Sequence, residues 1–421
     1  MYKIRYKSHH DASRALKARF EIKTDKTEYV AGLLSSPASS RRVIYIHVPF
    51  CTKICSFCPF HRPDELSRRE YDKYIINEID RISGFEYMRA PIDAINFGGG
   101  TPTALCPEQM SRILEKLHKS FDVRQGAEIS VETSITELTD DMASALKDGG
   151  VNRISIGVQT FDNDGRKLLG RRGSGEAAVE RIIKTKTAGF ENIGIDLIYN
   201  YPGQTERSLM RDVETIKSLG LAGISFYSLM LHDGTPIVSK ISGEQLDIMN
   251  NVARERELFD IIVDGLYDDG YRFFELTKLI RNDLDRYDYI RIRHAGGSCV
   301  AVGHGAGGNI ENYVYHNSVH SSLLGENAPI SSMGRVLEDK YFILDEFIND
   351  LQKMTVDINI YSRRLGFDLL SALSKNLEDA QNEGLITLEG SRVTLTNDGI
   401  FWGNNFIDEL IGRILTNSNG A

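Results

Sequence analysis

Three cysteines stand close together in the stretch YIHVPFCTKICSFCPFH. Cys51, Cys55 and Cys58 are spaced C-x3-C-x2-C and directly follow VIYIHV, an apolar run that we expect to be a strand. Three thiolates in one loop can hold three irons of a cubane [4Fe–4S] cluster. Zinc is the alternative, because it takes four ligands in a closed structural site and His61 could supply the fourth. The motifs further along the chain favour the cluster.

A cubane held by three cysteines has one iron without a protein ligand. That iron can bind the amino and carboxylate groups of S-adenosylmethionine (SAM). An electron from the reduced cluster can then break the sulfonium C–S bond and release a 5′-deoxyadenosyl radical. The cofactor carries this chemistry, while the protein orients it and excludes water.

A glycine run and a set of polar residues accompany the later apolar stretches. NFGGGTP (96–102) ends the second expected strand, and glycines let the backbone approach a ligand closely because no Cβ intervenes. Polar residues near the ends of other expected strands are Glu132, Thr133, Gln159, Asp196 and, in LLGRRGS, Arg171. Any one of them could serve a structural hydrogen bond instead, since a polar group in an apolar strand must be satisfied. Together they predict a ligand site at the mouth of a barrel.

Short apolar runs alternate with amphipathic stretches from residue 43 onward. Strands are expected over 43–48, 92–100, 127–133, 152–159, 192–200 and 223–230. Helices are expected over 68–82, 107–121, 139–150, 174–190 and 205–221. This alternation predicts βα units, a parallel sheet and right-handed crossovers. The predicted fold class is therefore α/β, with a partial or full (β/α) barrel.

Changes in composition and in hydrophobic periodicity divide the chain into four predicted segments. These are an N-terminal arm (1–42), the barrel (43–300), a Gly-rich connector (301–329) and a C-terminal helical domain (330–421). The arm is polar and weakly periodic, so it either packs on the rest or stays mobile. In the last segment, helices precede a hairpin at ITLEGSRVTLT and a final helix, which is a winged-helix-like pattern. Because this segment is rich in Asp and Glu, we interpret it as a packing domain rather than a nucleic-acid binder.

The composition is ordinary for a globular protein. The chain has 421 residues, of which 41% are hydrophobic and 26% charged, and its formal net charge is −9. A mildly acidic chain is a poor candidate for nucleic-acid binding. No apolar run reaches the ~18 residues of a membrane helix, and the N-terminus lacks an apolar h-region, so we expect a cytoplasmic protein. Three clustered cysteines out of five argue against a disulfide framework, and Cys106 and Cys299 are expected to be buried.

Five motifs occur in order over residues 43–235. They are YIHVPFC-x3-C-x2-C, INFGGGTPT, RISIGVQTFD, LGR and IDLIYNYPGQT. In this order they resemble the radical SAM proteins related to oxygen-independent coproporphyrinogen dehydrogenase, a family that also contains haem chaperones. The resemblance implies an incomplete (β/α)6 barrel, a [4Fe–4S] cluster on the three cysteines, and one or two SAM molecules in one cavity. It also implies a reducing partner such as a flavodoxin or ferredoxin.

The resemblance further assigns residues to the cofactor pocket. Tyr45 would pack near the SAM bound to the cluster. The other residues implied for cofactor binding are Phe57, Gly99, Gly100, Thr101, Glu132, Gln159, Arg171, Asp196 and Ala301. The segment from Ala301 to Ala306 resembles the glycine-rich segment that follows the barrel in the family.

Some positions depart from the family pattern. Relatives read roughly G-x-G-P-G-A-H where this chain reads AVGHGAGGN, and Phe60-His61 stand where an aspartate or asparagine is usual. Haem-chaperone members tend to carry H-N-x-x-Y-W. Here the run from His316 to His320 matches only its first two positions, which weakens the chaperone interpretation.

Three functions are compatible with the resemblance. The first is transfer of a SAM-derived methyl or methylene carbon to an unsaturated ring or tetrapyrrole, with His304, His316 and His320 as candidate catalytic groups. The second is oxidative decarboxylation of a porphyrinogen propionate, for which Arg171–Arg172 and Arg291–His294 could supply positive charge. The third is a haem-binding delivery protein without turnover. Haem would be a substrate in the first and a ligand in the third.

Overall fold

The structure is a computed structural model, and it describes residues 2–8, 10–60, 68–281, 284–317 and 334–417. Six parallel strands form the centre of the molecule, each hydrogen-bonded to the next one along the chain. They are β2 (Arg42–Val48), β3 (Ile92–Gly99), β4 (Val123–Ser134), β5 (Arg153–Gln159), β6 (Asn192–Tyr199) and β7 (Gly223–Ser228). The six strands predicted from the sequence are confirmed, as is the α/β fold class.

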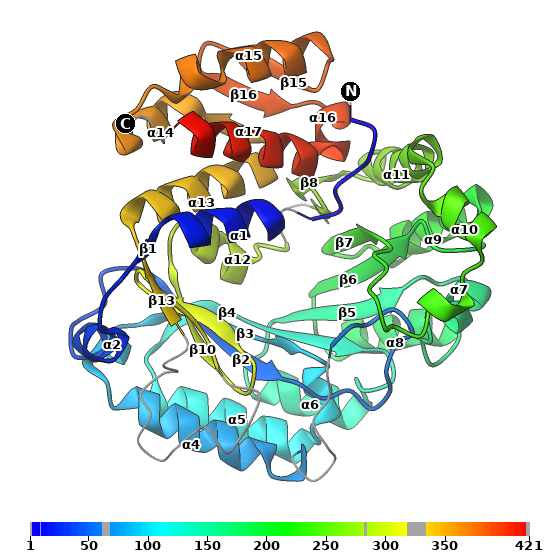
Figure 1. Ribbon diagram of the computed structural model, residues 1–421. Coiled ribbons are helices and arrows are strands. Elements are labelled where there is room, and N and C mark those ends of the chain that lie inside the picture. Colours follow the sequence, from blue (N-terminus) through cyan, green and yellow to red (C-terminus); the bar gives the residue numbers. More distant parts are fainter. Residues whose placement is uncertain (1, 9, 61–67, 282–283, 318–333, 418–421) are drawn as a thin grey trace.

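Helices connect these strands and lie on the outside of the curved sheet (Figure 1). They are α4 (Tyr71–Ser83), α5 (Pro107–Ser120), α6 (Asp140–Asp148), α7 (Asn163–Leu168), α8 (Gly175–Thr187) and α9 (Glu206–Leu219). Their starts follow sequence signals: the Thr139 hydroxyl accepts from the Met142 amide at the start of α6, and Pro107 opens α5. The five predicted helices are confirmed, and α7 is an additional short one.

Further strands extend both edges of the central sheet. β10 (Ser298–Val302) pairs parallel with β2. Antiparallel strands continue beyond it as β11 (Gly307–Ile310), β12 (Tyr313–His316), β13 (Gly334–Leu337) and β1 (Glu21–Ile22). On the other edge β9 (Lys278–Arg281) and β8 (Tyr271–Glu275) follow β7. β1 and β8 are the two edge strands of this sheet, so the described strands form an open barrel. Each of the four predicted segments, the arm, the barrel, the connector and the C-terminal segment, contributes at least one strand to the sheet.

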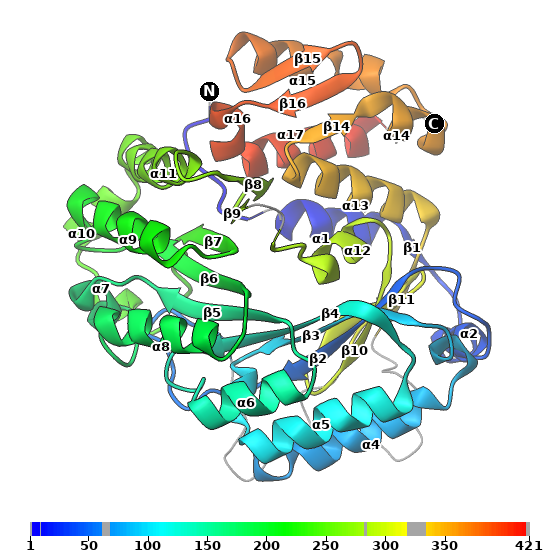
Figure 2. The same ribbon diagram turned by 180° about the vertical axis from the view of Figure 1, so that it is seen from behind.

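Three more helices belong to the second half of the barrel. α10 (Gly243–Met249) and α11 (Val252–Tyr267) pack outside β7 and α9, whereas α12 (Asp288–His294) lies in the middle of the molecule (Figures 1 and 2). α12 packs against β2, β3 and β10 on one side and against α13 on the other. It therefore separates the barrel interior from the C-terminal domain.

The C-terminal domain covers the open side of the barrel (Figures 1 and 2). Its elements are α13 (Asp339–Gln352), β14 (Thr355–Asp357), α14 (Ile358–Leu365), α15 (Leu369–Asn382), β15 (Ile386–Glu389), β16 (Arg392–Leu395), α16 (Asn397–Phe401) and α17 (Gly403–Asn417). β15 and β16 form the predicted hairpin, and β14 pairs with β16. Helices beside this small sheet give the winged-helix-like arrangement predicted from the sequence.

The N-terminal arm packs on both other parts of the molecule. It contains α1 (His10–Arg19) and α2 (Lys26–Leu34), and α1 contacts α13 and α17. The Arg5 guanidinium bonds Glu255 on α11 at 2.5 Å and the Phe401 carbonyl at 2.7 Å, while Lys7 Nζ donates to the Leu229 carbonyl at 2.9 Å. The arm therefore fastens the barrel to the C-terminal domain.

Candidate active site in the barrel interior

The cysteine loop directly follows β2 and is fastened to the segment after α7. The Ser56 amide donates to the Leu169 carbonyl at 3.0 Å, and the Ser56 hydroxyl donates to the Leu168 carbonyl at 2.6 Å. Gly170 has φ +72°, and a Cβ at this position would lie 2.9 Å from the Ser56 nitrogen. The LGR motif therefore needs its glycine to let the two loops meet.

Hydrogen-bond donors reach the sulfurs of Cys55 and Cys51. Arg171 Nη1 donates to Cys55 Sγ at 2.9 Å, and Thr101 Oγ1 donates to Cys51 Sγ at 3.4 Å. The Cys58 amide donates to the Cys55 carbonyl at 3.3 Å, which closes a turn. All three cysteines are half-buried, and none of the five cysteines forms a disulfide. Arg171 and Thr101, both predicted from the sequence to bind cofactor, therefore lie beside the predicted cluster ligands.

Each glycine of the GGG run leaves room for a different neighbour. A Cβ on Gly98 would lie 2.8 Å from a Glu132 carboxylate oxygen, and one on Gly99, whose φ is +112°, would lie 2.7 Å from the His47 ring. A Cβ on Gly100 would lie 2.5 Å from the Phe50 carbonyl oxygen. The run thus packs against the cysteine loop and against a barrel carboxylate at the same time.

Glu132 and Asp196 project into the interior of the barrel. Glu132 is accessible to solvent, yet protein surrounds its carboxylate, so it faces an internal space rather than the outer surface. Burial and the Asp196 carboxylate raise the pKa of Glu132 to about 7. Burial also raises the pKa of Asp196, opposed by the positive charges of Lys278, Arg153 and Arg171. Two accessible carboxylates in an enclosed space are suited to bind a cationic ligand.

Gln159 and Arg171 complete this side of the interior. Gln159 ends β5 with φ +73°, and a Cβ on Gly157 would lie 3.0 Å from Gln159 Nε2. The guanidinium of Arg171 donates to the Gly157 carbonyl as well as to Cys55. The end of β5 therefore joins the cysteine loop to the barrel interior. Phe57 packs instead against a separate apolar cluster that includes Leu169.

Tyr45 lies in register with Ala301 of β10 and Asn96 of β3. Its hydroxyl is 3.0 Å from His47 Nδ1, and its ring stacks on that of Tyr289 with the centroids 6.0 Å apart. Burial and the nearby His304 lower the pKa of His47 to about 4, so this imidazole is neutral near pH 7. His47 was not singled out from the sequence, although its alternation with Tyr45 along β2 could have placed both on one face.

The predicted catalytic histidines are placed differently from one another. The His304 ring packs 4.3 Å from that of Tyr74, and burial lowers the pKa of His304. His304 Nε2 is buried and has no hydrogen-bond partner among the described residues. His316 is exposed at the end of β12, while Asn317 turns inward and donates to the Ala301 and Gly303 carbonyls at 3.1 and 3.0 Å. His320 and His61 lie outside the described residues, so their roles stay predictions.

A buried ion triad in the barrel was missed from the sequence. Arg153 binds Asp285 through two hydrogen bonds of 2.8 and 3.1 Å, and Lys278 Nζ lies 2.8 Å from the same carboxylate. The three side chains are at most 3% exposed. The positive charges of Lys278 and Arg153 outweigh burial and hold the pKa of Asp285 well below its ordinary value. The Tyr287 ring lies below Arg153 and Lys278, 4.5 and 4.6 Å away.

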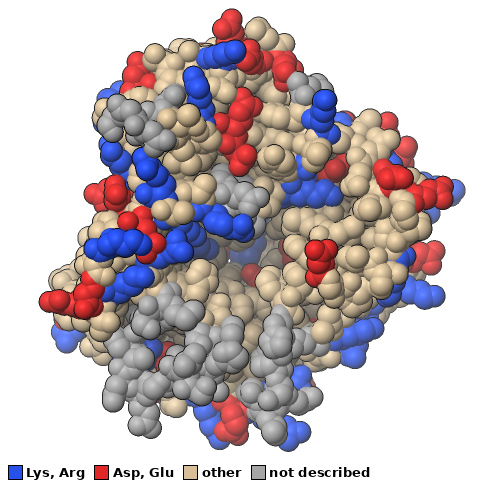
Figure 3. Space-filling model, viewed as in Figure 1, with Lys and Arg blue, Asp and Glu red and all other residues tan. Residues whose placement is uncertain are grey.

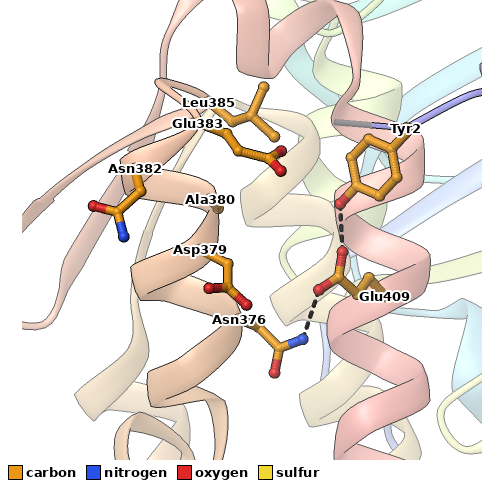
Figure 4. A pocket seen from close by; sticks show the side chains of 8 residues that line it. All are labelled: Tyr2, Asn376, Asp379, Ala380, Asn382, Glu383, Leu385 and Glu409. Carbon is orange, nitrogen blue, oxygen red and sulfur yellow. Dashed lines mark hydrogen bonds between the residues drawn. The ribbon is translucent and has the colours of Figure 1, made fainter.

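A pocket of about 410 Å³ lies between Tyr2 and helices of the C-terminal domain (Figure 4). Glu409 on α17 accepts hydrogen bonds from the Tyr2 hydroxyl at 2.5 Å and from Asn376 Nδ2 at 2.6 Å. Asp379 and Glu383 also line it. The pocket is where the start of the chain meets the C-terminal domain, and the contacts seen there are structural.

Comparison with known proteins places the cysteine loop in a family. The sequence model described as the Radical SAM superfamily matches residues 45–216, a range that contains the three cysteines, the GGG run and Asp196. The chain carries a radical SAM domain. The family resemblance expected from the sequence is therefore confirmed. A radical SAM domain implies a [4Fe–4S] cluster and SAM as cofactors.

Relatives match nearly the whole chain. The chain is 28% identical to an anaerobilin synthase of Escherichia coli O157:H7 over 90% of this chain and 86% of that one. It is 28% identical to the haem chaperone HemW of Lactococcus lactis (90% and 98%), and 27% identical to an oxygen-independent coproporphyrinogen III oxidase of Bradyrhizobium diazoefficiens (90% and 88%). In structure it resembles coproporphyrinogen III oxidase (HemN) of Escherichia coli, with a TM-score of 0.80, 20% identity, and 94% and 95% of the two chains covered. The radical SAM domain and the domains around it thus share that fold.

The residues around the loop fit the two implied cofactors. The three thiols lie in a short loop on which Arg171 and Thr101 converge, and the GGG turn packs directly against the start of this loop. Among the described residues no group of three or more His, Cys, Asp or Glu side chains is arranged to hold a single metal ion. A cubane differs from a single ion because each thiolate binds a different iron. Of the helices in the described ranges, none is long and apolar enough to cross a membrane.

Proposed function

We propose that this protein is a radical SAM enzyme that cleaves SAM reductively and transfers a SAM-derived carbon to a tetrapyrrole. Cys51, Cys55 and Cys58 would hold the [4Fe–4S] cluster, which supplies the electron that breaks a C–S bond of SAM. The observation that carries the proposal is the convergence of the cysteine loop, through Arg171 and the GGG turn, on an enclosed space lined by Glu132 and Asp196.

The chain's own residues have separable tasks in this proposal. The Gly98–Gly100 backbone and Thr101 would hold the amino acid end of SAM beside the loop. Glu132 and Asp196 would compensate the positive charge of SAM, because an anionic group in an enclosed space attracts a cation strongly. The C-terminal domain and α1 would limit the entry of water to the barrel interior (Figure 1).

The relatives support a tetrapyrrole substrate class. Three near-full-length relatives are named for anaerobilin, for haem and for coproporphyrinogen. The first of these relatives is named a synthase, which supports an enzyme that converts a tetrapyrrole. A reducing partner such as a flavodoxin or ferredoxin would supply the electron.

Oxidative decarboxylation of a porphyrinogen is the second candidate, and the likeness to a coproporphyrinogen III oxidase supports it. A haem chaperone without turnover is the third. Against it stands Asn317, which in this chain holds the Ala301 and Gly303 carbonyls and so serves the backbone rather than a ligand.

An anaerobic product assay separates the three functions. The protein is reconstituted with iron and sulfide, reduced, and given SAM with haem or with coproporphyrinogen III. S-adenosylhomocysteine and 5′-deoxyadenosine in comparable amounts with haem would support carbon transfer. Deoxyadenosine and methionine without S-adenosylhomocysteine would support decarboxylation. Neither product, with haem retained on the protein, would contradict both enzymatic functions.

A further inference from the structure

Arg293 is an accessible cation in the middle of the molecule. It lies on α12, which is packed between the strands β2, β3 and β10 and the helix α13. Arg293 is nevertheless an exposed residue, while protein surrounds its guanidinium. The side chain therefore faces the space between the barrel and the C-terminal domain. Figure 3 shows a hollow at the centre of the molecule, with Lys and Arg side chains gathered along the border near α1 and α12.

The guanidinium of Arg293 is held in place by an aromatic ring. Nη1 donates to the Tyr289 hydroxyl at 3.1 Å, and the guanidinium carbon lies 5.3 Å from the centre of the same ring. Tyr289 is 6% exposed and stacks on Tyr45, the residue expected beside SAM. One aromatic layer therefore separates Arg293 from the predicted SAM pocket, and a guanidinium has several donors left after a single bond to a phenol.

Lys17 adds a second positive charge beside α13. It lies on α1, which packs against α13. Lys17 and Arg293 both act electrostatically on Asp345 of α13, whose carboxylate accepts from Tyr341 at 3.3 Å and from Asn349 at 3.4 Å. Neither Lys17 nor Arg293 has an ion-pair partner within 4.0 Å in the described part of the chain. One carboxylate for two cations leaves a net positive charge.

We propose that Arg293 and Lys17 form a subsite for a carboxylate of the substrate, on the far side of Tyr289 from the SAM pocket. A guanidinium recognises a carboxylate through two parallel hydrogen bonds, and the lysine adds a point charge. This proposal rests on the proposed function, because it takes the substrate to be a tetrapyrrole. It adds that the tetrapyrrole carries a carboxylate which the protein recognises. The carboxylate of SAM could bind the same two side chains, and the experiment below distinguishes SAM from the substrate.

Haem and haem dimethyl ester differ only in their two carboxylates, so they are the probes. Binding of each to the full-length, cluster-loaded protein is followed anaerobically by absorbance titration without reductant, so that no turnover is required. Wild type is expected to bind haem more tightly than the ester. Arg293→Met and Lys17→Met should each weaken haem binding by about tenfold or more, the loss of a charge-assisted hydrogen bond, and leave ester binding unchanged. Arg293→Lys should recover part of the loss.

Matched controls and a SAM titration complete the experiment. Arg413→Met removes an exposed arginine of α17 and should change nothing. Equal binding of haem and ester by wild type, equal losses for both probes, or a loss of SAM affinity in Arg293→Met would each overturn the subsite. If Arg293→Met does not fold, the proposal is tested by Lys17→Met and by whether the wild type binds haem more tightly than the ester. Haem binding that depends on Arg293 without S-adenosylhomocysteine formation would support the subsite while contradicting the proposed reaction.

Discussion

Two sets of charged side chains inside the barrel differ in what satisfies them. Arg153, Lys278 and Asp285 satisfy one another at 2.8–3.1 Å and are almost completely buried. Glu132 and Asp196 are enclosed by protein but remain accessible. A buried charge is tolerated when it is paired and hydrogen-bonded. The closed triad therefore belongs to the framework, whereas enclosed but accessible charges indicate a place for a ligand.

The largest expected effect comes from removing a predicted cluster ligand. Cys55→Ala should abolish iron binding and SAM cleavage, because the cubane would keep only two thiolate ligands. Iron analysis and the absorbance spectrum of the anaerobically reconstituted protein measure this. Cys106 is exposed at the start of α5, contrary to its expected burial, and Cys106→Ala is the control. A full four-iron spectrum in Cys55→Ala would contradict the assignment.

Opening the closed triad should affect stability. Asp285→Ala leaves Arg153 and Lys278 buried without their counter-charge, which should lower the free energy of unfolding by about 3–5 kcal/mol. Urea denaturation at pH 7 measures it, with Asp260→Ala on the surface of α11 as a control worth about 0.5 kcal/mol. Because the folded-state pKa of Asp285 lies below its ordinary value, its stabilisation is present above the unfolded-state pKa and is lost as the pH falls. The difference between wild type and variant should therefore shrink in acid; an unchanged difference would count against the triad.

Changing an accessible carboxylate should affect binding instead. Asp196→Ala should weaken SAM binding by about 10- to 100-fold, the value of a charge-assisted contact, and leave the cluster spectrum intact. Equilibrium dialysis with the reconstituted protein measures the affinity. Equal SAM affinity in wild type and variant would remove Asp196 from the pocket, and loss of the cluster would make its role structural.

The smallest effect concerns the protonation of Glu132. Its pKa of about 7 means that the carboxylate gains its charge between about pH 6 and pH 8. SAM is a cation, so its affinity should rise with pH across this window, by at most about tenfold per pH unit. Glu132→Gln should flatten that dependence. Because the pKa of Glu132 is raised in the folded state, the free energy of unfolding should also fall as the pH rises from the ordinary pKa of a glutamate through about 7. Glu132→Gln should remove this decline. A wild-type affinity independent of pH would refute the titration.

Much of the predicted cofactor site could be found from the sequence because the motifs that indicate it are each short and continuous in the chain. The C-x3-C-x2-C spacing, the GGG run and single polar residues in apolar strands are each visible within a few positions. Parallel strands bring their ends to one edge of the sheet, so Glu132, Gln159 and Asp196 could be expected to share a site. The structure places Arg171 on Cys55, a contact between residues 116 positions apart that neither the residue spacing nor the family resemblance had suggested.

The other features of the interior and of the N-terminal arm depend on contacts between distant residues, which the spacing of residues in the sequence does not reveal. Asp285 pairs with Arg153 across 132 positions, from a segment without periodicity. The arm was ambiguous because its helices are short and polar, and what holds it are bonds such as that of Arg5 to Glu255. Arg293 was seen as one of several basic residues in the α12 sequence, and only the packing of α12 shows that it faces the interior. Long-range pairing of this kind is set by tertiary structure rather than by local pattern.

The most direct test of carbon transfer uses SAM with a deuterated methyl group. The reduced, reconstituted protein is given this SAM together with haem, and the products are analysed by mass spectrometry. If a SAM methyl group both loses a hydrogen to the deoxyadenosyl radical and supplies the new carbon, 5′-deoxyadenosine will gain one deuterium and the tetrapyrrole will gain a deuterated carbon. Unlabelled 5′-deoxyadenosine together with an unlabelled tetrapyrrole would contradict carbon transfer.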